Sequence, residues 1–185
     1  LLEAMNMDCP VICSDIGSFS EIANDAAIFF NPTDTESIKH KMENSIFDDQ
    51  LLSDLKKKGI QSLLLDVDGT LVNRKSNMIP KTVKNWIIES KDLFSLYLIS
   101  NNPSKKRIEK IAKELNLRYK YNASKPWKKV TLSAIKEIGS EPKNIGIIGD
   151  RIFTDIIVGN RCNIKTILVK RLNRDGLPIK CNLTL

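Results

Sequence analysis

The chain has 185 residues, of which 42% are hydrophobic and 28% are charged, and its formal net charge is +7. This composition excludes an intrinsically disordered chain, and the length allows one ordinary domain or one domain with an added fragment. The basic excess favours anionic partners such as phosphates or anionic lipid, and we expect no nucleic-acid partner.

No apolar run approaches the ~20 residues of a membrane-spanning helix, so we expect no transmembrane segment. The four cysteines lack the paired spacing of a zinc site, which favours reduced thiols in a cytoplasmic protein.

The first 58 residues differ from the rest of the chain in the order of their expected strands and helices. Two short apolar runs, Cys9–Asp15 and Asp25–Asp34, are expected to be strands. The stretch after them predicts a helix that Asp34 or Thr35 caps and Gly59 ends. These residues predict a small N-terminal α/β fragment, separate from the remainder of the chain.

From Ile60 onward, short apolar strands alternate with helices. The expected strands are Ser62–Asp66, Phe94–Ser100, Arg118–Asn122, Asn144–Gly149 and Lys165–Val169. The expected helices are Pro80–Ser90, Pro103–Leu115, Pro126–Ile138 and Thr154–Cys162, three of which have a proline in the first turn, where proline is tolerated. This alternation predicts an α/β fold, a parallel sheet with helices on both faces.

Polar side chains follow four of the expected strands. In chain order they are Asp66 and Asp68, then Ser100, then Lys125, and then Asp150 with Asp155 behind it. Because the carboxyl ends of parallel strands converge on one crevice, we expect these side chains to share one place.

In this order, "DVDGT", Ser100, Lys125 and "GDRIFTD" resemble the four motifs of the haloacid dehalogenase (HAD) superfamily phosphatases. The stretches "LISNNPSKKRIEKIAKELNL", "SKPWKK" and "GDRIFTDIIVGNRCNIKTILVK" resemble its YqeG branch, which is similar to phosphatidylglycerophosphate phosphatases. The resemblance covers about residues 60–172. It implies a capless HAD-like Rossmannoid domain at 59–185 that hydrolyses phosphomonoesters with Mg²⁺ through an aspartyl-phosphate.

The resemblance also implies roles for the acidic residues. Asp66 would bind Mg²⁺ with one oxygen and attack phosphorus with the other. Asp68 would protonate the leaving oxygen, later deprotonate water, and give its backbone carbonyl to the metal. Asp150 would be the second carboxylate on Mg²⁺, a hard cation that prefers oxygen ligands.

The remaining motif residues would bind the phosphoryl group or support the site. Ser100, Asn101 and Lys125 are the expected phosphate ligands. Gly69 permits a tight turn beside Thr70, and Asp155 would position Lys125 or a metal-bound water.

The spacing between the motifs bears on the substrate. One helix and one strand fill most of each gap, from Asp66 to Ser100 and from Ser100 to Lys125, which leaves no room for an inserted cap domain. The cleft should therefore be open, which suits a phosphate presented on something large, such as a lipid headgroup at a membrane surface. Basic residues that could meet anionic lipid, or could instead form a solvated surface, are Lys105, Lys106, Arg107, Lys170, Arg171, Arg174 and Lys180.

Residues 1–58 resemble the end of a GT-B retaining glycosyltransferase. Glu3 would match the glutamate that contacts the ribose of the nucleotide-sugar donor, while the first glutamate of that pair and the acceptor domain are absent from the chain. We expect residues 1–58 to be a gene-fusion remnant, the tail of a longer bifunctional chain, or a plain α/β appendage packed on the phosphatase. The alternative function is thus a truncated glycosyltransferase, with only part of its nucleotide-sugar site, fused to the phosphatase.

Overall fold

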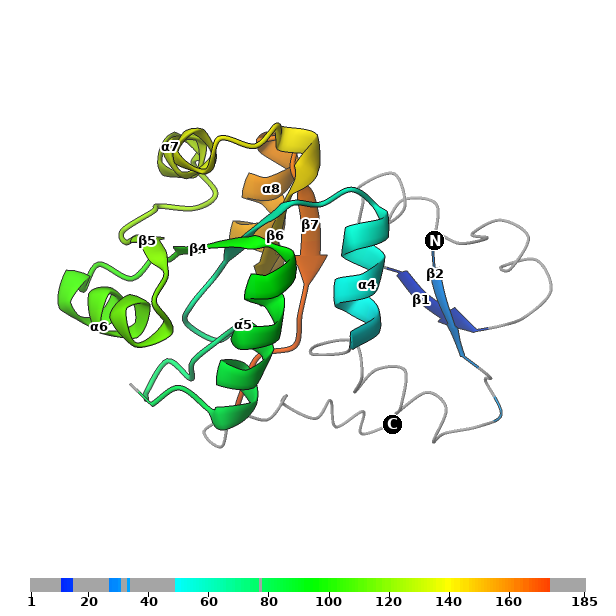
Figure 1. Ribbon diagram of the computed structural model, residues 1–185, viewed down its shortest axis with the longest axis horizontal. Coiled ribbons are helices and arrows are strands. Elements are labelled where there is room, and N and C mark those ends of the chain that lie inside the picture. Colours follow the sequence, from blue (N-terminus) through cyan, green and yellow to red (C-terminus); the bar gives the residue numbers. More distant parts are fainter. Residues whose placement is uncertain (1–10, 15–26, 31–32, 34–48, 77, 174–185) are drawn as a thin grey trace.

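The computed structural model describes residues 11–14, 27–30, 33, 49–76 and 78–173. Its centre is a five-stranded sheet in which every strand runs parallel to its neighbours (Figure 1). In the order of the sheet the strands are β5 (Arg118–Lys120), β4 (Ser95–Ile99), β3 (Ser62–Leu65), β6 (Ile145–Gly149) and β7 (Lys165–Leu168). The predicted α/β fold with a parallel sheet is confirmed.

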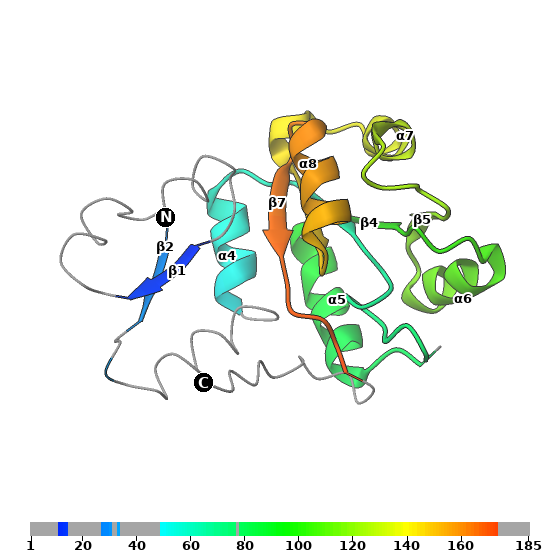
Figure 2. The same cartoon turned by 180° about the vertical axis from the view of Figure 1, so that it is seen from behind.

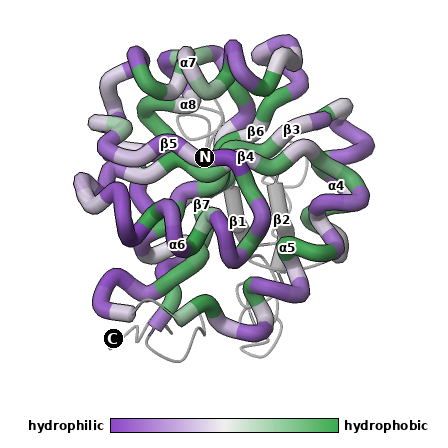
Figure 3. Tube along the Cα trace, turned by 60° about the vertical axis from the view of Figure 1, so that its left-hand side comes forward, coloured by the Kyte–Doolittle hydropathy of each residue, from purple (hydrophilic) through white to green (hydrophobic). Residues whose placement is uncertain are grey.

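Helices cover both faces of this sheet (Figures 1 and 2). The helices are α4 (Asp49–Lys57), α5 (Lys81–Leu93), α6 (Lys105–Leu115), α7 (Lys128–Ile138) and α8 (Ile157–Arg161), with a 3₁₀ turn η2 (Pro142–Asn144) and a π-helix η3 (Ile152–Ile156). Apolar side chains of α4, α5 and α6 pack with Leu63 and Leu65 on one face. Those of α7 and α8 pack with Leu64 and Tyr97 on the other. Figure 3 shows hydrophobic and hydrophilic residues alternating along the helices, as expected for helices that pack one face against the sheet.

The central strand β3 explains why the site forms where it does. Its residues Leu63, Leu64 and Leu65 are all fully buried, because helices cover both faces of the sheet. The chain passes from β3 to β4 and β5 on one side, and then returns to β6 and β7 on the other. A reversal of strand order of this kind opens a crevice at the carboxyl ends of the strands on either side.

Two of the four expected helices begin later than their prolines suggest. Pro80 directly precedes α5, but Pro103 and Pro126 lie before the capping residues Ser104 and Trp127. The reason at α6 is a side-chain cap: the Ser104 hydroxyl accepts a hydrogen bond from the Arg107 N–H at 3.4 Å. The helix expected from Thr154 instead begins as the π-helix η3 at Ile152.

The N-terminal part contributes a separate pair of parallel strands, β1 (Val11–Ser14) and β2 (Ala27–Phe30), where strands were expected. Helix α4 is the described portion of the helix expected up to Gly59. The rest of that prediction, together with Glu3, Arg174 and Lys180, lies outside the described residues. Within the described segments, none of the helices has the length and apolar character needed to cross a membrane.

Candidate active site

The site is built around the turn that follows β3. The Asp66 N–H donates to the Ile148 carbonyl at 2.9 Å, which continues the sheet up to this residue. Beyond it, the N–H groups of Leu71 and Val72 both donate to the Val67 carbonyl at 3.0 Å, so the chain turns back at once. Gly69 has a φ of +105°, and a Cβ there would lie 2.5 Å from an Asp150 carboxylate oxygen. The glycine therefore provides the turn and lets β6 bring Asp150 against it.

Lys125 lies at the bottom of the site, where its side chain is buried between two carboxylates. Its Nζ donates to Asp66 Oδ1 at 2.7 Å, to Asp155 Oδ1 at 2.5 Å and to the Ile99 carbonyl at 3.1 Å. Burial alone lowers the pKa of Lys125, but the charges of Asp66 and Asp155 outweigh it and raise that pKa. Burial raises the pKa of Asp66, although the ammonium group opposes this shift. The three groups therefore form one charged cluster.

The π-helix η3 turns Asp155 into the site. The Asp155 Oδ2 accepts hydrogen bonds from the Arg151 N–H at 3.2 Å and from the Thr154 hydroxyl at 3.1 Å. The side chain also lies against Gly149, where any Cβ would overlap with the carboxyl carbon of Asp155. Both oxygens of Asp155 are thus occupied by protein donors, which suits its expected role of positioning Lys125.

Three carboxylates gather at this point as a group that could hold a cation. One oxygen from each of Asp66, Asp150 and Asp155 lies within 4.8 Å of the others. Asp150 Oδ2 accepts from Arg171 Nε at 2.7 Å, whereas its buried Oδ1 has no hydrogen-bond partner within the described part of the chain. A buried carboxylate oxygen without a donor fits a cation ligand. An all-oxygen set of this kind suits Mg²⁺, as the sequence predicts.

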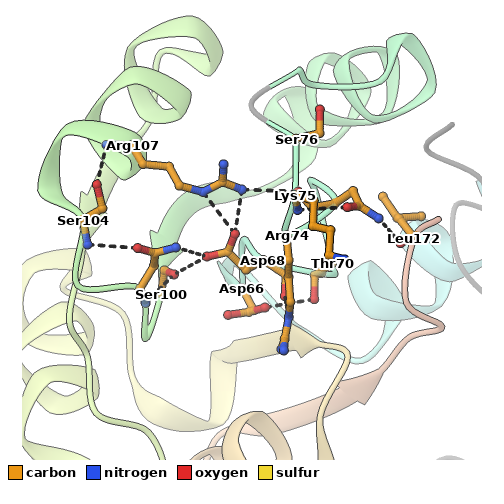
Figure 4. A network of polar contacts seen from close by, with 12 residues as sticks. Asp66, Asp68, Thr70, Arg74, Lys75, Ser76, Ser100, Ser104, Arg107 and Leu172 are labelled. Carbon is orange, nitrogen blue, oxygen red and sulfur yellow. Dashed lines mark hydrogen bonds and ion pairs between the residues drawn. The ribbon is translucent and has the colours of Figure 1, made fainter. Parts of the chain in front are cut away.

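The second aspartate of the motif, Asp68, points away from Asp66 toward α6 (Figure 4). Its Oδ1 accepts from Arg107 Nη2 at 2.8 Å and from Arg107 Nε at 3.2 Å. Its Oδ2 accepts from the Asn102 amide at 2.8 Å and from the Ser100 hydroxyl at 3.4 Å. The backbone carbonyl of Asp68, the expected metal ligand, accepts from Arg74 Nε at 3.4 Å.

The expected phosphate ligands lie on the loops after β4 and β5. Ser100 is buried at the end of β4, and its hydroxyl accepts from the Asn102 N–H at 3.0 Å. The Asn101 side chain accepts from the Lys125 N–H at 2.7 Å and donates to the Lys125 carbonyl at 2.8 Å. Asn101 therefore fixes the loop that presents Lys125, while its role as a phosphate ligand stays a prediction.

These side chains surround a single hollow of about 250 Å³, lined by Asp66, Asp68, Arg74, Ser100, Asn101, Asn102, Lys125, Arg151, Thr154 and Asp155. Thr70 helps to fix Asp66, because its hydroxyl donates to Asp66 Oδ2 at 3.2 Å. The strand ends thus bring together the side chains predicted to share one place. The prediction lacks five contributors, namely Arg74, Asn102, Arg151, Thr154, and Arg107 as a partner of Asp68.

Comparison with known proteins finds similarities in both parts of the chain. The model of a HAD-hydrolase-like family matches residues 122–174, and that of the group 1 glycosyl transferases matches residues 1–62. The chain is 29% identical over 130 residues to the probable phosphatase YqeG of Bacillus subtilis (strain 168), across 69% of this chain and 75% of that protein. A crystal structure of an uncharacterized protein from Listeria monocytogenes serotype 4b superposes with a TM-score of 0.51 at 15% identity. That match covers 68% of this chain and 85% of the other, and it shows a shared fold.

Proposed function

We propose that this chain is a HAD-like hydrolase, and specifically a phosphatase that hydrolyses phosphomonoesters through a phosphorylated Asp66. The observation that carries the proposal is the position of Asp66: its carboxylate lines an open hollow, with Lys125 at 2.7 Å and a second aspartate two residues further on. The similarity to a probable phosphatase of the YqeG type supports the same reaction class.

The reaction follows from the two aspartates of the turn. The Asp66 carboxylate attacks phosphorus, a P–O bond to Asp66 forms, and the P–O bond to the alcohol breaks while Asp68 gives its proton to the leaving oxygen. Water then attacks phosphorus and gives a proton to the Asp68 carboxylate, and the P–O bond to Asp66 breaks. Inorganic phosphate leaves, and both aspartates return to their starting forms. Lys125 and Ser100 supply positive charge and a hydrogen bond to the phosphoryl oxygens.

Mg²⁺ would be held by the carboxylates of Asp66 and Asp150 and by the backbone carbonyl of Asp68. When bound, it supplies the positive charge that screens the phosphate dianion. We assign Asp155 to Lys125 rather than to the ion, because both of its oxygens already accept hydrogen bonds from the protein.

Substitution of the nucleophile tests this function directly. Asp66→Asn keeps the shape of the side chain but removes its charge, so we expect Mg²⁺-dependent phosphate release from an aryl phosphate to fall by about a thousandfold or more. The matched control is Asp92→Asn on the exposed side of α5, which should keep activity within about twofold. Full activity of Asp66→Asn would exclude the mechanism.

For the substrate we propose phosphatidylglycerophosphate or another lipid phosphate, hydrolysed at the surface of a membrane. A second, mostly apolar hollow adjoins the catalytic one and shares Arg151 and Thr154 with it. Ile152 and Phe153 from η3 and Leu168 from β7 line it, and the Phe153 side chain is 79% exposed. Lys170 and Arg171 stand at the same hollow and could meet anionic headgroups, which supports a peripheral membrane location.

The Phe153→Ser variant tests whether the substrate is a lipid or a soluble phosphate. If the ring contacts lipid, kcat/KM on vesicles containing phosphatidylglycerophosphate should fall about tenfold, since burying such a ring contributes about 1.5–3 kcal/mol. Activity on a soluble aryl phosphate should stay within about twofold. Leu132→Ser, at an exposed leucine of α7, is the control that should change neither. Equal losses on both substrates, or no loss on either, would argue against a lipid.

The match of residues 1–62 to the group 1 glycosyl transferases supports a second role for the N-terminal part. We propose that residues 1–58 are a unit separate from residues 59–185, and that they descend from a nucleotide-sugar site that included Glu3. Calorimetric titration of the whole chain with UDP-glucose tests whether that site still binds. Binding that Glu3→Gln weakens would support the second role, and absence of binding would leave the phosphatase as the function of the chain.

A further inference from the structure

Arg107 is the only described residue that places two N–H groups on a carboxylate of the Asp66–Asp68 turn. Its Nη2 and Nε lie 2.8 Å and 3.2 Å from the same oxygen, Asp68 Oδ1, and both side chains are only 15% exposed. The same Nη2 also donates to the Asn73 carbonyl at 3.3 Å. Arg107 therefore joins helix α6 to the loop that carries the proposed acid of the reaction.

The geometry assigns different tasks to the two oxygens of Asp68. Arg107 occupies Oδ1, and it does not line the catalytic hollow. Oδ2 accepts instead from Asn102 and Ser100, which do line it. The bond from Ser100 is long, at 3.4 Å, and its hydroxyl can turn toward a phosphoryl group. Oδ2 is then the oxygen that faces the reacting atoms.

We propose that Arg107 is a positioning residue for proton transfer, one that fixes the Asp68 carboxyl group so that Oδ2 exchanges the proton. This inference rests on the proposed phosphatase reaction. In the first step the proton passes from Oδ2 to the leaving oxygen as its bond to phosphorus breaks. In the second step Oδ2 takes a proton from the attacking water. A guanidinium suits this task, because its rigid fork fixes orientation as well as charge.

The test uses leaving groups that differ in their need for a proton. An alkoxide leaves poorly without protonation, whereas a strongly activated phenolate leaves without it. General acids contribute about 10²–10⁴-fold. For Arg107→Met we therefore expect kcat/KM to fall about 10–100-fold on alkyl phosphates, but less than about threefold on the most activated aryl phosphate. Arg107→Lys, which keeps the charge but loses the fork, should fall between Arg107→Met and the unsubstituted chain.

The controls separate positioning from folding. Lys110→Met, at an exposed position of the same helix α6, should leave the whole series unchanged within about twofold. In an Asp68→Asn background, Arg107→Met should add less than about threefold, because both changes remove the same step.

Equal losses of Arg107→Met across the leaving-group series would overturn the inference while the phosphatase stands, and so would losses that multiply with those of Asp68→Asn. Unchanged kinetics of Arg107→Met would do the same. A chain without Mg²⁺-dependent turnover on any substrate of the series would instead overturn the proposed function, and the role of Arg107 with it.

Discussion

Lys125 shows how one residue can serve both stability and chemistry. Its ammonium group lies buried between Asp66 and Asp155, so it offsets two negative charges that would otherwise repel each other in the interior. Since its pKa is raised, the charged form persists at neutral pH, and its contribution to stability disappears only as the pH rises past that pKa. A comparison at pH 7 therefore measures the whole contribution.

Replacement of Lys125 should move stability and metal binding in opposite directions. Lys125→Met leaves two buried carboxylates without their cation, so in EDTA we expect unfolding to require about 3–5 kcal/mol less. Mg²⁺ should then raise the melting temperature more than it does for the unsubstituted chain, because a competing positive charge is gone. Scanning calorimetry with EDTA and with Mg²⁺ measures both effects.

The matched control for that experiment is an exposed lysine pair. Lys113 lies 3.0 Å from Glu109 on the surface of α6, and such pairs contribute little to stability. Lys113→Met should therefore change neither melting temperature nor its response to Mg²⁺. An unchanged response in Lys125→Met would contradict the proximity of the ammonium group to a cation site.

For individual residues, the sequence identifies those that follow strands but misses those that reach across the cleft. Asp66, Lys125 and Asp150 can be found because each comes directly after an expected strand or its loop. Arg107 cannot be found in this way, because in the sequence it is one of three consecutive basic residues on an expected helix surface. Its contact with Asp68 depends on the angle of α6 and on its rotamer, which no local pattern encodes.

Among the elements, η3 and α8 form the segment that presents Asp155 to the site. Helix α8 approaches the sheet closely at Gly159, where a Cβ would lie 2.7 Å from a methyl group of Ile147 and would overlap with one of Thr166. Both neighbours belong to β6 and β7, and they have no room to move in a buried layer. The position therefore requires glycine for packing.

We expect Gly159→Ala to lower the free energy of unfolding by about 1–3 kcal/mol, the usual effect of overpacking. Urea denaturation measures the change, and Ser133→Ala on the exposed face of α7 should stay within about 0.5 kcal/mol. If Gly159→Ala were as stable as the original chain, the close approach of α8 to the sheet would be wrong.

The elements themselves were largely predictable from the sequence, and their ends were not. All five strands of the main sheet lie within their expected ranges. Four of them are short runs rich in apolar or β-branched residues, whereas β5 is the short polar strand Arg118–Lys120 at the edge of the sheet. The prolines predict the starts of α6 and α7 two residues too early, since proline is compatible with a helix start without requiring one. The sequence does not predict the π-helix, because no local pattern distinguishes it from the α-helix expected at the same place.

For the whole molecule, the decisive feature is the order of the strands. Because β3 lies between β4 and β6, loops that are distant in sequence meet at one edge and enclose the hollow with Asp66 and Lys125. Strand–helix alternation predicts a parallel sheet, and the convergence of its strand ends predicts a shared site. The apolar hollow beside Phe153 was beyond prediction, since it arises where η3 and the end of β7 come together.

The whole account depends on a covalent phosphoryl group on Asp66. The most direct measurement starts by quenching the protein in acid during turnover of an aryl phosphate with Mg²⁺. Tandem mass spectrometry of its peptides then locates the added phosphoryl group. We predict that the mass lies on Asp66 and is absent from Asp66→Asn. Phosphate release from a chain whose label lies on another residue, or whose Asp66→Asn variant turns over normally, would contradict it.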